Sequence, residues 1–168
     1  VPRLRALGVC DRRRGWRGME REPVCITESN DGWDGAPLYA PDGKSIAFLH
    51  QETPGYESDL FGLGILDRES GSTRYVTPVE NFDEWVGDMR WSSDGSELYF
   101  QAEHHGRTPL YRVDRSGGDV ELVHTHATID AWEVTADGEG IVYAGRAVAE
   151  PPELYHLATS GNRIADDA

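Results

Sequence analysis

Tyr56 and Glu57 stand side by side in a polar stretch, residues 51–59, and are the first candidates for chemistry in this sequence. A carboxylate next to an aromatic ring can hold an ammonium group through an ion pair and a cation–π contact. A charged loop that is simply solvated shows the same residues. We therefore expect Tyr56 and Glu57 as candidate substrate-binding residues, with a solvated loop as the competing interpretation.

A second acidic group, formed by Glu80, Asp83 and Glu84, precedes Trp85. The group comes just before a segment with strand character, which places it in a connection between two units of the fold. This position favours a solvated acidic rim over a binding site.

Four of the six histidines come in two close pairs, His104 with His105 and His124 with His126. Residues two apart on a strand share a face, so His124 and His126 could converge on one ion. A useful metal site needs a third or fourth ligand. None stands at a fixed spacing from these histidines, so the sequence predicts no metal site.

Catalytic motifs are missing from the sequence. No pentapeptide has the form G-x-S-x-G, the nucleophile elbow of α/β-hydrolases. Ser72, Ser93 and Ser116 lie in or beside turns, and their spacing supports no catalytic triad. Gly62 and Gly64 lack the third glycine and the following helix of a phosphate-binding loop. We expect no catalytic residue and no cofactor in residues 1–168.

The elements that would position these residues come from an internal repeat, the first pattern to seek in a sequence. Residues 37–48, 89–100 and 132–143 align without gaps, with Asp-Gly at the same two places and an aromatic residue at the end. Alternating apolar residues before Asp-Gly and an apolar run after it are typical of a hairpin. Asp accepts backbone N–H groups in such turns and Gly takes a positive φ. We therefore expect a structural role for the six turn residues, which are Asp42, Gly43, Asp94, Gly95, Asp137 and Gly138.

A second hairpin pattern follows each Asp-Gly unit, so each repeat of 43–52 residues contains about four strands. This is the size of one propeller blade. The sequence predicts an all-β fold, a partial β-propeller of about three four-stranded antiparallel blades. Its expected limits are residues 25–168, with repeats near 30–80, 81–126 and 127–163. The third repeat lacks the sequence for its last strand, and three blades are too few to close a propeller.

Charge divides the chain near residue 24. The 168 residues carry a net charge of −14, and their mean hydropathy is −0.56. Residues 1–24 hold seven arginines and three acidic residues, whereas residues 25–168 hold nine basic and 27 acidic residues. An acidic body repels phosphate, so we expect no nucleic-acid partner, and no apolar stretch is long enough to span a membrane.

The Arg-rich head, residues 1–24, matches nothing in the repeat. It is either a non-native stretch or the remnant of a preceding blade. The first residue is Val1 rather than methionine, and we expect the chain to be a piece of a longer protein.

Three segments carry a family resemblance. Residues 30–51 are similar to a blade motif written W-S-P-D-G-K-x-I-A-F, and residues 54–59 and 66–71 extend the match. Over residues 25–161 the chain resembles the N-terminal β-propeller of prolyl-oligopeptidase-type serine peptidases, in the dipeptidyl-peptidase and acylaminoacyl-peptidase branch. The blade motif also occurs in TolB-type propellers, which bind protein partners. The stretch Gly-Tyr-Glu-Ser-Asp at residues 55–59 favours the peptidase branch.

The resemblance implies a noncatalytic segment that gates peptide access to an α/β-hydrolase domain absent from this chain. The peptide substrate would then be reached only through that domain, and residues 1–168 would be inactive alone. The alternative is a TolB-like module that binds a protein partner. Either would operate in a bacterium, in the cytoplasm or exported to the periplasm or medium. An incomplete propeller also predicts self-association through exposed blade faces.

Overall fold

The computed structural model describes residues 24–125 and 128–159, and this part of the chain forms strands without any helix. None of it could therefore cross a bilayer as a helix. The strands are β1 (Asp34–Tyr39), β2 (Ser45–His50), β3 (Gly62–Asp67), β4 (Thr73–Tyr75), β5 (Val86–Trp91), β6 (Glu97–Ala102), β7 (Leu110–Asp114), β8 (Glu121–His124), β9 (Thr128–Val134), β10 (Gly140–Ala147) and β11 (Glu150–Ala158). The Arg-rich head expected over residues 1–24 lies outside the described residues except for Val24.

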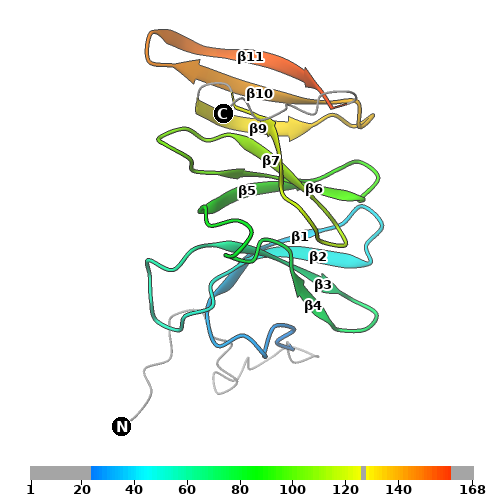
Figure 1. The fold of residues 1–168 in the computed structure, drawn as a ribbon. Helices are drawn as coiled ribbons and strands as arrows, with labels where there is room; N and C mark the ends of the chain where they lie inside the picture. The colour runs from blue at the N-terminus through cyan, green and yellow to red at the C-terminus, as the bar shows by residue number, and fades with distance from the viewer. Residues whose placement is uncertain (1–23, 126–127, 160–168) are drawn as a thin grey trace, which may run out of the picture.

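The strands form three antiparallel sheets in the order in which they occur along the chain. Sheet 1 contains β1 to β4, sheet 2 contains β5 to β8, and sheet 3 contains β9 to β11. The sheets are stacked face to face, with sheet 1 and sheet 3 at opposite ends (Figure 1). This is a partial all-β propeller, as the repeat predicts, and the described residues up to 159 contribute three strands to sheet 3.

Each repeat turns at its Asp-Gly pair. Gly43, Gly95 and Gly138 have φ values of 67°, 72° and 75°, a region that side chains with a Cβ rarely adopt. The preceding carboxylate accepts a backbone N–H two residues further on, at 2.8–3.0 Å in all three turns. These turns connect the first two strands of each sheet, which pair antiparallel with one register shift further along the strands.

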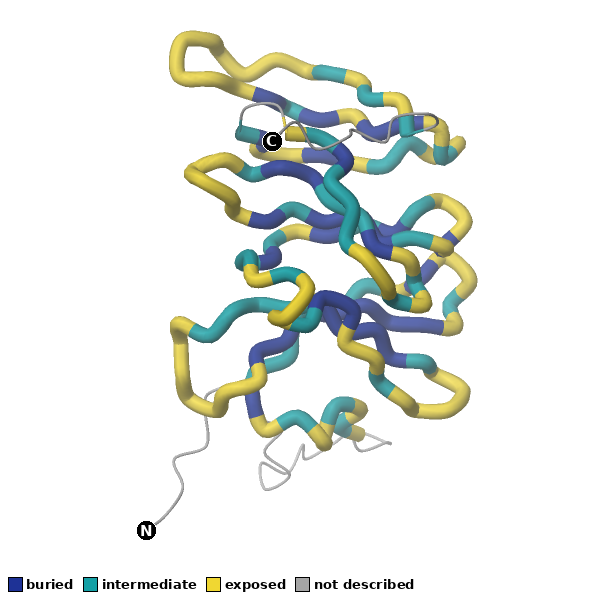
Figure 2. The backbone as a smooth tube through the Cα atoms, in the orientation of Figure 1, coloured by how far each residue is buried: buried dark blue, intermediate teal, exposed yellow. Residues whose placement is uncertain are grey.

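Buried residues occur on strands of all three sheets (Figure 2), and their side chains form apolar clusters between neighbouring sheets. One cluster joins sheet 1 to sheet 2 and includes the buried Leu63, Trp91 and Phe100. The other joins sheet 2 to sheet 3 and includes Leu110, Trp132 and Ile141. Because strand side chains alternate between faces, sheet 2 presents apolar residues to both of its neighbours.

Candidate functional site

The loop between β2 and β3 carries Tyr56 and Glu57 at the surface. Tyr56 is 56% exposed and Glu57 is exposed as well. Asp59 holds the loop, because its carboxylate accepts the backbone N–H groups of Glu52 at 3.0 Å and Thr53 at 2.6 Å. Partial burial alone would raise the pKa of Asp59, but the hydrogen bonds led by the Thr53 N–H hold it below its usual value. The binding role of Tyr56 and Glu57 stays a prediction.

The three acidic residues before Trp85 have different surroundings in the structure. Glu80 and Asp83 are exposed, whereas Glu84 pairs with His104, whose Nδ1 lies 2.6 Å from Oε1 of Glu84. His105 packs its ring edge against His104. The sequence places Glu84 and His104 twenty residues apart and gives no signal for this pair.

The histidines predicted to form no metal site have other contacts. Nε2 of His124 lies 2.8 Å from the hydroxyl oxygen of Tyr143 in sheet 3. His126 falls outside the described residues. Within residues 24–125 and 128–159, no group of three or more His, Cys, Asp or Glu side chains could hold a metal ion.

Trp33 and Trp85 occupy the same repeat position, and an aromatic ladder connects them. Phe61 packs between the two tryptophans in edge-to-face geometry, with ring centroids at 5.0 and 5.1 Å. Phe61 was not among the residues that the repeat singles out. The ladder connects the segment before β1 with the segment before β5, so these aromatic residues have a structural role.

Sheets 1 and 2 each have a polar pocket at an equivalent position, which we call the sheet 1 notch and the sheet 2 notch. The sheet 1 notch has a volume of about 370 Å³ and the sheet 2 notch about 290 Å³, near the lower end of ligand pockets. Their linings correspond position by position, since Arg74 opposes Ile65 as Glu121 opposes Arg112. The sheet 1 notch is lined by Ser45, Ile65, Asp67, Ser70, Ser72, Arg74 and Arg115.

The sheet 1 notch receives a guanidinium from the neighbouring sheet. Arg115, which follows β7, donates to Asp42 at 2.8 Å and to the hydroxyl oxygen of Ser45 at 2.7 Å. The hydrogen bond from Arg115 is the main reason why the pKa of Asp42 is lowered. Arg115 therefore links sheet 2 to sheet 1 beside this notch.

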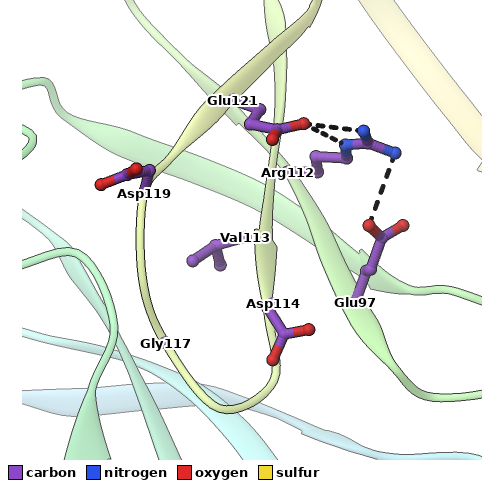
Figure 3. Close-up of a pocket in the computed structure, with 7 residues that line it drawn as sticks. All are labelled: Glu97, Arg112, Val113, Asp114, Gly117, Asp119 and Glu121. Atoms are coloured by element: carbon purple, nitrogen blue, oxygen red, sulfur yellow. Dashed lines mark hydrogen bonds and ion pairs between the residues drawn. The ribbon is translucent and has the colours of Figure 1, made fainter. Parts of the chain in front are cut away.

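Among the residues that the structure describes, sheet 3 contributes no guanidinium to the sheet 2 notch. The residue equivalent to Arg115 is Thr159, which donates to the Gly138 carbonyl at 3.1 Å. Arg112 of sheet 2 instead pairs with Glu121 at 2.7 Å and Glu97 at 3.4 Å (Figure 3). Four carboxylates and one guanidinium line this notch, so its electrostatics favour a positive group: Glu97, Asp114, Asp119 and Glu121 surround Arg112.

Sequence reasoning missed both notches, although a signal was present. Arginine follows the last residue of the third strand in two repeats, at Arg68 and Arg115, and threonine stands there in the third. Only the contact between sheets shows what that arginine does.

Comparison with known proteins shows that the chain is similar in sequence to part of the dipeptidyl-peptidase 5 proteins. It is 30% identical over 132 residues to dipeptidyl-peptidase 5 of Porphyromonas gingivalis, which takes in 79% of this chain and 19% of that protein. It is also 30% identical over 135 residues to a probable dipeptidyl-peptidase 5 of Arthroderma benhamiae, covering 78% of this chain and 18% of that protein. The chain is a homologue of the dipeptidyl-peptidase 5 proteins. It spans about a fifth of the length of these relatives. No family model matches it.

Solved structures show the same fold. The β-propeller domain of the Trilobed protease from Pyrococcus furiosus has a TM-score of 0.58 at 14% identity, over 76% of this chain and 39% of that domain. Pyrococcus horikoshii acylaminoacyl peptidase has a TM-score of 0.57 at 21% identity, over 74% of this chain and 19% of the peptidase. TolB from Acinetobacter baumannii has a TM-score of 0.58 at 21% identity, over 76% and 31% of the two chains. At these identities the likeness concerns the fold alone. This chain shares that fold with the two peptidase structures and with TolB.

Proposed function

We propose that this chain is a noncatalytic propeller segment of a serine peptidase and gates the access of peptides to a hydrolase domain that these residues do not contain. The observation that carries the proposal is the 30% identity to dipeptidyl-peptidase 5, which extends over 79% of the chain. The absence of a G-x-S-x-G elbow in the sequence agrees with a supporting rather than a chemical role.

The shape and charge of the segment suit such a role. The stacked sheets form a packed scaffold, and its turns are fixed by short hydrogen bonds. Residues 25–168 are strongly acidic, and an acidic surface attracts the positively charged N-terminus of a peptide. On this proposal Glu57 and Tyr56 are the residues that meet the peptide.

The product of the complete reading frame provides the test. Residues 1–168 alone should release no chromophore from a dipeptidyl p-nitroanilide, whereas the complete product should release it. Glu57→Gln in that product should raise KM by roughly fivefold with little change in kcat, because an ion pair to the ammonium is lost. Glu52→Gln, an exposed carboxylate of the same loop, is the matched control. A reading frame that ends without a hydrolase domain would overturn the proposal.

The likeness to TolB supports a second candidate, a propeller module that binds a protein partner. This candidate predicts a reading frame with further blades and an export signal but without a hydrolase domain. The sequence of the complete reading frame therefore distinguishes the two functions, because only the peptidase proposal predicts a hydrolase domain.

A further inference from the structure

The sheet 1 notch lies between two four-stranded sheets rather than at an end of the stack. Ile65 lines it and belongs to the apolar cluster that joins sheet 1 to sheet 2. Ser45 of the lining is only 2% exposed, and Arg115 enters the notch from sheet 2. A volume of about 370 Å³ is sufficient for a small molecule or for the end of a peptide.

Arg115 is held in a fixed orientation at this notch. Its Nη1 donates to Asp42 at 2.8 Å and to the carbonyl of Gly95 at 3.5 Å, and its Nη2 donates to the hydroxyl oxygen of Ser45 at 2.7 Å. A guanidinium has five N–H groups in a planar fork. These three contacts therefore leave N–H groups of Arg115 for a further acceptor.

Arg74 in β4 supplies a second guanidinium. Its Nη1 donates to the backbone carbonyl of Arg115 at 3.4 Å, and its Cδ lies 3.5 Å from the place of a Cβ on Gly117. Arg74 therefore extends across the boundary between sheets 1 and 2. Among the described residues no carboxylate lies within ion-pair distance of Arg74, whereas four other arginines have one.

Asp67 contributes the one carboxylate of the described lining, and its own turn covers it. Oδ1 of Asp67 accepts the backbone N–H groups of Glu69 at 3.1 Å and Ser70 at 2.7 Å, and the hydroxyl of Ser70 at 2.8 Å. The hydroxyl oxygen of Ser72 lies 2.8 Å from that of Ser70 and extends this chain. These donors offset the negative charge of Asp67 within the turn.

The sheet 2 notch shows that the repeat does not require this distribution of charge. Three positions differ between the notches, because Ser45, Ser72 and Arg74 of sheet 1 are replaced in sheet 2 by Glu97, Asp119 and Glu121 (Figure 3). The lining of the sheet 1 notch thus has three carboxylates fewer and one guanidinium more. In a chain with a net charge of −14, this notch is suited to an anion, whereas the sheet 2 notch repels one.

We propose that the sheet 1 notch binds an oxyanion, a carboxylate or phosphate group, with the guanidiniums of Arg74 and Arg115 as its donors. Asp42 already pairs with Arg115, so Arg115 positions the ligand and Arg74 supplies the uncompensated positive charge. The planar fork of N–H donors on arginine matches the oxygens of both groups. The volume of the notch favours a free anion or the terminal carboxylate of a peptide over a larger ligand.

Isothermal titration calorimetry of the product of the complete reading frame, at constant ionic strength in chloride, tests the proposal. The probes are inorganic phosphate, N-acetyl-dialanine and the C-terminal amide of that dipeptide. Arg74→Gln should raise the dissociation constant about tenfold, and Arg74→Lys about threefold because lysine keeps the charge but loses the fork. Ser72→Asp, which copies the acidic residue of the sheet 2 notch, should also weaken binding at least about tenfold.

Arg107→Gln and Ser58→Asp are the matched controls, since they make the same changes of charge at exposed positions outside the notch lining. Both should leave the dissociation constant unchanged. Arg74 and Ser72 are themselves exposed, so their variants should fold, and circular dichroism checks this.

The probes also identify the source of the oxyanion. Binding of phosphate alone indicates a phosphate site, binding of the dipeptide but not of its amide indicates a peptide carboxylate, and binding of both indicates a general oxyanion site. Each supports the proposal when Arg74→Gln weakens it. No binding of either anion, or equal effects of test and control variants, would overturn it. The readout is binding rather than peptide hydrolysis, so it is separate from the test of the proposed function.

Discussion

The guanidinium of Arg115 in sheet 2 lies 2.8 Å from the carboxylate of Asp42 in sheet 1, across 73 positions of sequence. It also lies over the ring of Trp91, whose indole Nε1 donates to the Leu38 carbonyl at 3.2 Å. One arginine thus contacts both the Asp-Gly turn of sheet 1 and strand β5 of sheet 2.

Replacing Arg115 should loosen this contact between the two sheets. Arg115→Met should lower the Tm by about 2–5 °C at neutral pH, and Arg115→Lys should lie in between because lysine keeps the charge but not the planar fork. The pKa of Asp42 is lowered in the folded state, so this stabilisation is present at neutral pH and is lost as the pH falls through that lowered pKa. Thermal unfolding as a function of pH measures both effects. A Tm loss in Arg115→Met that persisted unchanged in strong acid would contradict the ionic contribution.

Asp94 should titrate far into the acid range. Hydrogen bonds from the backbone and hydroxyl of Ser96, and then from the hydroxyl of Ser92, lower its pKa to about 2. Its contribution to stability is therefore complete above the unfolded value of roughly 3.9 and is lost as the pH falls toward 2. Carboxyl NMR titration of wild type and Ser96→Ala measures this, and the variant should titrate at a higher pH. Ser70→Ala is the control in another turn and should leave Asp94 unchanged.

His50 should make the fold sensitive to mild acid. It is only 5% exposed, and neither ring nitrogen has a hydrogen-bond partner in the described part of the chain. Burial lowers the pKa of His50 below its usual value of 6.5, although nearby carboxylates oppose the shift. The unfolded chain then binds more protons, so stability is complete above about 6.5 and falls as the pH drops toward the lowered value. The free energy of unfolding of His50→Leu should be flatter over this interval, and a slope equal to that of wild type would exclude His50 as the cause.

Leu63, Leu110 and Leu154 occupy one repeat position, as the strand registers show, and should differ sharply when they are shortened. Leu63→Ala and Leu110→Ala remove fully buried side chains and should cost about 2–5 kcal/mol each. Leu154→Ala changes an exposed position and should cost less than about 0.5 kcal/mol. Denaturant unfolding measures all three, and equal losses would show that the repeat positions are not packed as described.

The turn glycines should not tolerate a Cβ. Gly43→Ala places alanine at a φ of 67° in open space and should cost about 1 kcal/mol. Gly95→Ala has a φ of 72° and would also bring its Cβ to 3.2 Å from Cδ of Pro41, so it should cost more. Gly87→Ala, in β5 where the nearest backbone atom is 3.7 Å away, is the control without a positive φ. Equal stability of Gly43→Ala and Gly95→Ala would rule out a contribution from Pro41.

The sequence by itself determined the repeat, the turns and the number of strands. Asp-Gly at Asp42, Asp94 and Asp137 sets local backbone geometry, and local geometry is written in residues that are neighbours in sequence. The alternation of apolar residues around each turn then determines which side of each strand faces the core.

Only the tertiary structure decided how the sheets contact one another. The pairs Arg115 with Asp42, Glu84 with His104 and His124 with Tyr143 join residues from distant strands, and no spacing in the sequence specifies such pairs. Whether a repeated position is buried also depends on the neighbouring sheet rather than on the residue, as Leu110 and Leu154 show. Burial and ion pairing are properties of a surface in contact with another surface, and they are defined only when the sheets are stacked.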